Sequence, residues 1–161
     1  MDFDIRGNLP NKIEVTFDEF QSEFVTNWDL EGSTRQQIFQ VFQFYVEDFE
    51  KLISPNFTVW IDGSFVSNVK ARPNDIDAVF FIDFEIFEKN LKLIESRFGK
   101  YGVKGFYGDL LDIYVCPIYP PNHKNAFFTE SDKIRWIYQF SSTKPNRFGQ
   151  KFSKGFIEIK F

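Results

Sequence analysis

Two short apolar segments constrain the fold of this chain most, because a pair of acids lies at the entrance to one of them. Residues 57–61 and 76–82 are rich in β-branched and aromatic side chains, which predicts buried strands. Asp75 directly precedes the second segment, and Asp77 lies within it. Since side chains alternate between the two faces of a strand, we expect Asp75 and Asp77 on the same face.

A third acid lies in the same kind of setting. Asp112 falls within residues 110–116, another apolar segment. If this segment pairs beside 76–82, the three carboxylates meet on one face and repel one another unless a cation balances them. Mg²⁺ prefers such oxygen ligands, and three carboxylates suit two metal ions about 3.5–4 Å apart, the arrangement for in-line attack on phosphorus. Asp75, Asp77 and Asp112 are therefore the predicted catalytic residues and ligands of two Mg²⁺ ions.

The segment 57–61 is followed by Asp62-Gly63-Ser64, a sequence that suits a phosphate-binding turn. Glycine lets a backbone approach a phosphate closely, and a serine offers both a hydroxyl and an amide. We predict that Gly63 and Ser64 bind the nucleotide phosphates, with Lys70 and Arg72 on the loop that follows. Asp62 is expected to brace the loop rather than bind metal.

Each of these residues also has a simpler interpretation. Asp75 follows Pro73-Asn74, which favours a turn, and Ser64 can cap a short helix. Lys70 and Arg72 can be solvated loop charges. These alternatives stay open at the level of sequence.

The rest of the chain predicts a single mixed sheet with helices packed against it, an α/β (α+β) domain spanning residues 1–161. Residues 1–15 are predicted to be extended. Helices are predicted at 17–28, from 33 or 34 to about 53, at 84–98, and from 129 or 131 to about 140. Further strands are predicted at 103–107 and 156–161. The chain holds 23 phenylalanines, and many of these rings must lie in the core.

Composition excludes several classes of function. With one cysteine, Cys116, and one histidine, His123, the chain has neither a disulfide framework nor the residues of a Cys/His zinc site. The net charge of −4 argues against nonspecific nucleic-acid binding. No apolar stretch is long enough for a membrane span, and the polar N-terminal sequence lacks a secretion signal, so we expect a cytoplasmic protein that does not bind membranes.

The central motif resembles the nucleotidyltransferase superfamily, the polymerase-β-like group, and above all its minimal type. The matching residues are Gly63-Ser64, then Ala71-Arg72-Pro73, then Asn74-Asp75-Ile76-Asp77, with Asp112 on a later strand. Asn68 stands where that group has a second glycine, and Phe65 stands where relatives often have arginine or tyrosine. The segments "RGNLPNKI" near the start and "KGFIEIKF" at the end are similar to DUF6932, an uncharacterised family of bacterial nucleotidyltransferase-like proteins.

This resemblance implies a nucleotidyltransferase-like fold and transfer of a nucleoside monophosphate, with ATP or another NTP as donor, to an acceptor hydroxyl. Asp75 and Asp77 would hold both metal ions, and Asp112 would bind one and help to deprotonate the acceptor. Small members of the group often act as the antitoxin of a toxin–antitoxin pair by adenylylating a HEPN-type toxin, which makes such a toxin a candidate acceptor. The alternative is an inactive nucleotidyltransferase-like module that binds a protein partner, and a nuclease using the same acids is a third hypothesis.

Overall fold

The computed structural model describes residues 1–28, 31–69, 72–99 and 107–161. Its helices and strands follow one another as β1 Ile13–Glu14, α1 Phe17–Phe24, α2 Arg35–Leu52, β2 Thr58–Asp62, β3 Ile76–Asp83, α3 Phe84–Lys89, α4 Leu91–Leu93, β4 Leu111–Ile118, α5 Ala126–Phe140 and β5 Ile157–Lys160. Short 3₁₀ turns span Thr26–Trp28, Ser64–Val66 and Gly108–Leu110, and a π-helical turn spans Ile94–Phe98. In the part of the chain described, no helix is long and apolar enough to cross a membrane.

The strands form one five-stranded mixed sheet in the order β1-β5-β2-β3-β4. β2 is antiparallel to both of its neighbours, β3 and β5. β3 and β4 are parallel, and the chain passes between them through α3, α4 and the π-helical turn. β1 pairs in parallel with β5 at the other edge. The predicted fold class, one mixed sheet with helices against it, is confirmed.

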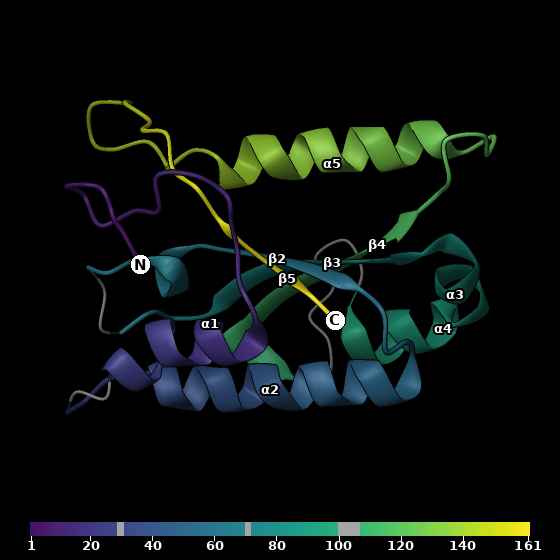
Figure 1. Ribbon diagram of the computed structural model, residues 1–161, viewed down its shortest axis with the longest axis horizontal. Helices are drawn as coiled ribbons and strands as arrows, with labels where there is room; N and C mark the ends of the chain where they lie inside the picture. Colours follow the sequence, from purple (N-terminus) through teal and green to yellow (C-terminus); the bar gives the residue numbers. More distant parts are fainter. Residues whose placement is uncertain (29–30, 70–71, 100–106) are drawn as a thin grey trace.

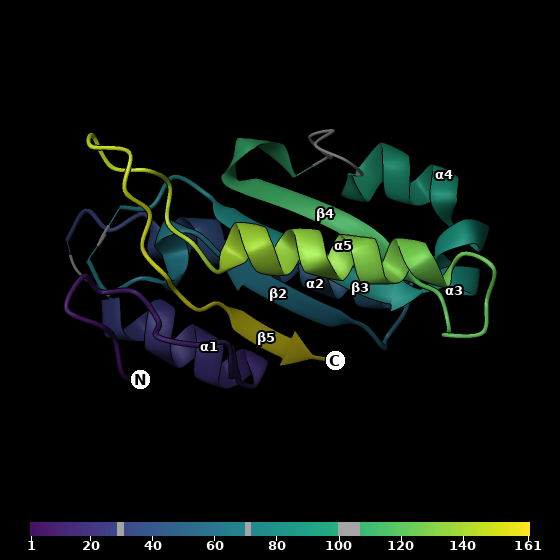
Figure 2. The ribbon, with the colours of Figure 1, turned by 90° about the horizontal axis from the view of Figure 1, so that it is seen from above.

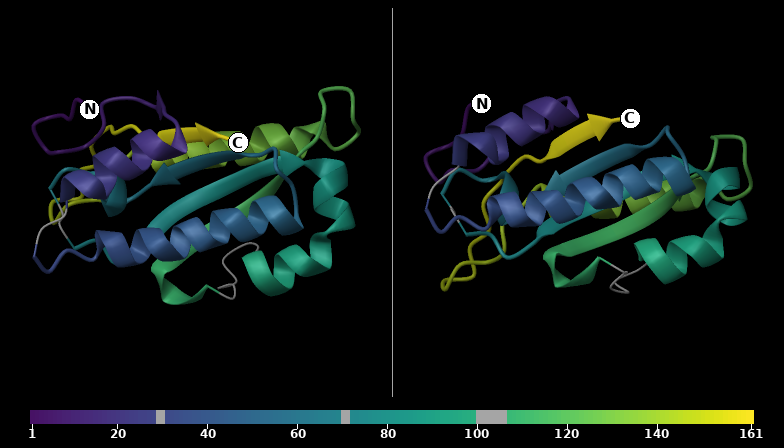
Figure 3. Two further views of the ribbon diagram at one scale, coloured as in Figure 1. Left: turned by 60° about the horizontal axis from the view of Figure 1, so that its bottom comes forward. Right: turned by 90° about the horizontal axis from the view of Figure 1, so that it is seen from below.

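Helices cover both faces of the sheet. α1 and α2 lie against one face, and α5 crosses the other (Figures 1 and 2). From below, α2 runs along the sheet with α1 beside it, and α3 and α4 lie at one end (Figure 3). The described elements therefore form three layers, and among them α5 is the helix of the third layer.

Alternation along β3 divides the core between these layers, as the sequence predicts. One face of β3 joins the large cluster under α1 and α2 through Ile76, Ala78, Phe80 and Ile82. The other face carries Val79 and Phe81 into a smaller cluster under α5, which includes Trp136 and Phe140. Asp77 has the same parity as Val79, so its side chain belongs to the α5 face.

The phenylalanines fill the layer between α2 and the sheet. Phe39, Phe42 and Phe49 of α2 are fully buried, and Phe49 meets Phe80 of β3 with ring centroids 5.0 Å apart. Aromatic pairs at this separation are favourable beyond the area that they bury. The apolar stripe of α2 is therefore core, as its helical spacing predicts.

The structure corrects several predicted boundaries. The helix predicted at 84–98 is interrupted at Asn90, whose side chain donates to the carbonyl of Ile86, and it ends in the π-helical turn. α5 begins at Ala126, before the predicted capping residues Thr129 and Ser131. Thr129 therefore lies inside the helix and is not its cap, and its hydroxyl accepts the backbone N–H of Tyr119. Of the strand predicted at 103–107, all but Tyr107 lies outside the described residues.

Candidate active site

Three aspartates form a row across adjacent strands at one end of the α5 face. Asp62 of β2 lies opposite Asp77 of β3, and Asp77 lies opposite Asp112 of β4. Residues at paired positions of neighbouring strands share a face with Cβ atoms about 5 Å apart. The strand register thus brings Asp77 and Asp112 together as the sequence predicts, and it adds Asp62.

The backbone of Gly63 lies directly against the Asp77 carboxyl group. A Cβ atom built on Gly63 would lie 1.9 Å from Oδ2 of Asp77, and the residue has φ +85° and ψ −167°. This region of the backbone map is open almost only to glycine. Gly63 is therefore required twice, for its conformation and for the close approach to Asp77.

Burial and neighbouring charges both perturb Asp77. Burial, followed by repulsion from Asp75, Asp62 and Asp112, raises the pKa of Asp77 from 3.8 to about 6, although Lys144 opposes the change. Repulsion from Asp75 shows that this acid, two residues before Asp77, also acts on the site. The site has an excess of negative charge, which is the condition that favours binding of a cation.

Asp62 already has a cation of its own. Both of its carboxylate oxygens accept from Nζ of Lys154 at 2.6 Å, and both side chains are nearly buried. Burial raises the pKa of Asp62, while Lys154, the backbone amide of Gly63 and Lys144 lower it in part. Asp62 thus braces the glycine turn and ties it to the segment that follows α5.

The segment that carries Lys154 is a basic hairpin, defined as residues 141–155. Ser142 and Ser153 form an antiparallel bridge, and the backbone of Asn146 donates to the carbonyl of Gln150. The hairpin contains four lysine or arginine residues and no acid, namely Lys144, Arg147, Lys151 and Lys154. The charge of Lys144 lowers the pKa of both Asp62 and Asp77, so the hairpin acts electrostatically on the aspartate row.

A buried arginine holds the turn after Gly63. The guanidinium group of Arg35, fully buried at the start of α2, donates to the carbonyls of Phe65 at 2.5 Å and Ser67 at 2.8 Å. It also donates to the carbonyl of Phe24 at 2.9 Å, so that it joins α1 to this turn. Burial lowers the pKa of Arg35 to about 10. Sequence reasoning missed Arg35, since one arginine at a helix start gives no signal of burial.

The remaining predicted residues are placed as follows. Ser64 begins the 3₁₀ turn after Gly63, half-buried, and its carbonyl accepts the hydroxyl of Ser67 at 2.9 Å. Arg72 is exposed, and its guanidinium group lies against Gly32 of the loop before α2. Lys70 lies outside the described residues. Pro73 is buried, and its carbonyl accepts the hydroxyl of Thr34 at 2.7 Å.

The donor chemistry at this end of the sheet fits a hard cation, because it consists of carboxylate oxygens that share one face and repel one another. As the side chains stand, the described residues contain no group of three His, Cys, Asp or Glu arranged around a single metal position. Asp77 and Asp112 face each other by register, and Asp112 is exposed, so both carboxylates lie on one face at this end of the sheet.

Fold and site together define an α+β protein with an acidic row at one end of a mixed sheet. The chain matches DUF6932, a family of unknown function, over residues 1–160, and it belongs to that family. No curated protein and no solved structure matches it. Membership of this family therefore assigns no activity to the chain.

Proposed function

We propose that the protein is an Mg²⁺-dependent nucleotidyltransferase that moves a nucleoside monophosphate, AMP from ATP, to an acceptor hydroxyl. The observation that carries the proposal is the register of Asp77 with Asp112 on parallel strands, beside a glycine turn that touches the Asp77 carboxyl group. Repulsion among the acids supports it further, because a bound cation would relieve that repulsion.

In the proposed reaction, the acceptor oxygen attacks the α-phosphorus of ATP, and a new P–O bond replaces the bond to pyrophosphate. Asp112 is exposed and accepts the hydroxyl proton. Asp75, Asp77 and Asp112 would hold Mg²⁺, which supplies positive charge to the phosphate oxygens. Gly63 and Ser64 bind the phosphates through backbone N–H groups and the serine hydroxyl.

Arg35 and Lys144 have supporting roles in this proposal. Arg35 holds the backbone of the turn in place through the carbonyls of Phe65 and Ser67. The phosphate-binding groups of the turn are therefore positioned before the nucleotide binds. Lys144 of the basic hairpin, whose charge lowers the pKa of Asp77, would meet the phosphate tail. Lys70 and Arg72 remain predicted phosphate contacts from the loop before β3.

Binding is tested by the melting temperature with Mg²⁺ and ATP. A ligand at 100 times its Kd stabilises by about 2.7 kcal/mol, which for a chain of this size raises Tm by roughly 5–10 °C. The shift should vanish in Asp77→Asn and Asp112→Asn and persist in Asp18→Asn, a control on the first turn of α1. An equal shift in all three variants would refute the assigned site.

Transfer is tested with ATP labelled at the α-phosphate and a cell lysate as the source of acceptors. Wild-type protein should label a lysate component, and a chain carrying both Asp75→Asn and Asp77→Asn should not. A HEPN-type toxin is one proposed acceptor, and it should become labelled when it is supplied alone. Cleavage of nucleic-acid phosphodiester bonds in the absence of NTP would instead support a nuclease.

A second candidate function is a non-catalytic module that binds a protein partner. The ion pair of Asp62 with Lys154 favours it, because a lysine of the chain itself neutralises one acid of the row. The outer face of α5 also exposes large apolar side chains, at Phe127, Ile134 and Tyr138. Under this alternative neither the ATP-dependent rise in Tm nor the labelling occurs.

A further inference from the structure

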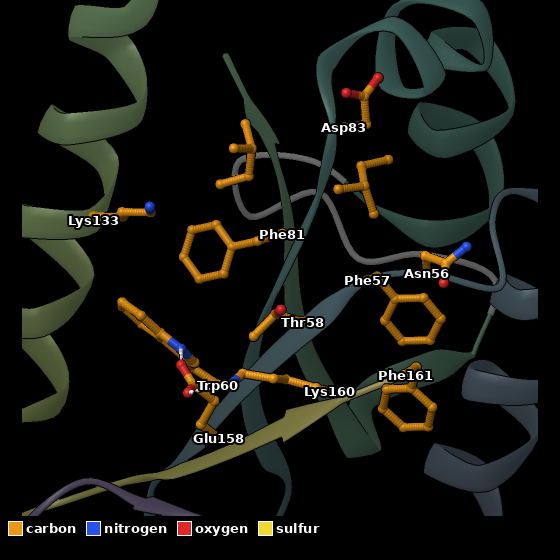
Figure 4. Close-up of a pocket in the computed structure, with 12 residues that line it drawn as sticks. Asn56, Phe57, Thr58, Trp60, Phe81, Asp83, Lys133, Glu158, Lys160 and Phe161 are labelled. Atoms are coloured by element: carbon orange, nitrogen blue, oxygen red, sulfur yellow. Dashed lines mark hydrogen bonds and ion pairs between the residues drawn. The ribbon is translucent and has the colours of Figure 1, made fainter. Parts of the chain in front are cut away.

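A pocket lies at the opposite end of the α5 face from the aspartate row. It has a volume of about 560 Å³ and lies between α5 and the ends of β2, β3 and β5 (Figure 4). Thr58 pairs with Phe81 at this end, four residues along each strand from Asp62 and Asp77. At about 3.3 Å per residue the two ends are roughly 13 Å apart.

Packed side chains separate the pocket from the aspartate row. Trp60 pairs with Val79 midway between the two ends, and both belong to the cluster under α5. Trp136 and Phe140 close this cluster from the helix. The pocket is therefore a site of its own, and an inference about it does not rest on the proposed nucleotidyltransferase activity.

The walls of the pocket are flat and apolar. Trp60 meets Phe81 edge-on on the α5 face, with ring centroids 4.8 Å apart. Phe57 and Phe161, which stack at 4.5 Å, border the pocket from the cluster under α1 and α2. Because these rings hold one another, the shape of the pocket exists before anything binds. Its volume falls in the range of about 300–1,000 Å³ typical of small-molecule sites.

The carboxylates at the pocket are already engaged. Glu158 accepts the indole N–H of Trp60 at 2.6 Å and pairs with Lys12 at 3.0 Å. Asp83 accepts the backbone N–H groups of Glu85 and Ile86 and so caps α3. Glu158 is therefore committed to two donors, and Asp83 uses its Oδ1 in the helix cap.

One cation, in contrast, is uncommitted. Lys160 pairs with Glu14 at 2.6 Å, but Lys133 of α5 forms no hydrogen bond or ion pair with any residue that the structure describes. Its side chain is half-buried and extends from α5 toward Phe81 (Figure 4). An ammonium group without a protein partner can donate a charge-assisted hydrogen bond to a carboxylate, which is stronger than a bond between neutral groups.

We propose that this pocket binds a small aromatic monocarboxylate. The ring system lies against Phe81 and the aromatic walls, and the carboxylate pairs with Lys133. The single uncommitted ammonium group favours a ligand with one negative charge, and the rings of Trp60 and Phe81 favour a flat apolar body.

The test uses naphthalene-2-carboxylate as the probe and its neutral amide as the matched comparison. In two-dimensional NMR spectra of the full chain, the carboxylate should shift the backbone amides of Thr58, Phe81 and Ile118 and leave those of Asp77 and Asp112 in place. The amide should bind at least about tenfold more weakly, since it lacks the charge.

Variants at Lys133 test the charge pairing. Lys133→Met should weaken binding of the carboxylate about tenfold, Lys133→Arg should retain it, and Lys124→Met, on the exposed loop before α5, should not change it. Lys133 is partly exposed, so these variants should fold, which far-ultraviolet circular dichroism checks. Absence of shifts at the pocket amides, or equal binding of the carboxylate to wild type and Lys133→Met, overturns the proposal.

Discussion

The contact between Gly63 and the Asp77 carboxyl group predicts a large and separable effect of Gly63→Ala. The backbone conformation alone, at φ +85° and ψ −167°, costs a non-glycine residue about 1–3 kcal/mol. The new Cβ would also lie 1.9 Å from Oδ2 and 3.0 Å from Cγ of Asp77, so the carboxyl group must move toward the other acids. We expect this collision to add about 1 kcal/mol or more.

A double-mutant cycle separates the two effects. In an Asp77→Ala background the carboxyl atoms are gone, and the nearest remaining atom of residue 77 is Cβ, 3.5 Å away, which is ordinary contact. Gly63→Ala should then cost only its backbone part. Free energies of unfolding from urea titrations in metal-free buffer measure all four proteins.

Gly149→Ala is the matched control for the cycle. Gly149 has φ +77° with no atom within 4 Å of an added Cβ, so its substitution strains the backbone without a collision. Its effect should be the same with and without Asp77→Ala. The reasoning fails if Gly63→Ala costs the same in both backgrounds to within about 0.5 kcal/mol, because the two residues would then act independently.

Three further predictions concern the same end of the molecule. The pKa of Asp77 is raised to about 6, so the folded state holds this proton more tightly than the unfolded chain. In metal-free buffer the free energy of unfolding should therefore fall by up to about 3 kcal/mol as pH rises from about 4 to about 7, and Asp77→Asn should remove that part of the pH dependence in urea titrations. Arg35→Met should lower the free energy of unfolding by about 3 kcal/mol or more, because buried carbonyls lose their donor. Arg35→Lys should not restore stability, since one ammonium group cannot replace the planar guanidinium group. Full recovery of stability in Arg35→Lys would contradict the geometry. Lys154→Met should cost roughly 3–5 kcal/mol by leaving Asp62 buried without its partner, and adding Asp62→Asn should recover most of the loss in thermal unfolding, whereas additive losses would exclude the pairing.

The alternation of side chains between the two faces of each strand allowed much of the fold to be predicted from the sequence. The apolar segments around Asp77 and Asp112 are strands, and the faces predicted for β3 are the faces that its residues occupy. What alternation cannot supply is strand order. The register of Asp62 with Asp77 depends on β2 lying antiparallel to β3, which no local pattern specifies.

Long-range contacts account for the residues that sequence reasoning missed. Lys154 reaches Asp62 across 92 positions, and Arg35 reaches the carbonyl of Ser67 across 32. Each is a charged residue in a polar segment, where an exposed side chain is the ordinary expectation. The interruption at Asn90 was missed for a local reason, because the apolar spacing of an α-helix continues through the break.

The parity of β3 has a consequence for how variation in this chain should be distributed. Successive residues of β3 pack into different layers. A scan that replaces each of them by every other amino acid should therefore show two alternating patterns of tolerance to substitution. Alternate positions from Ile76 to Ile82 should tolerate only changes of similar size and polarity, whatever property is selected. Val79 and Phe81 on the other face are buried under α5 and should be restricted as well. Asp77, at the end of that face, should be dispensable for abundance but not for activity, so that ligand preference can change at one end of a strand whose other residues keep the chain folded.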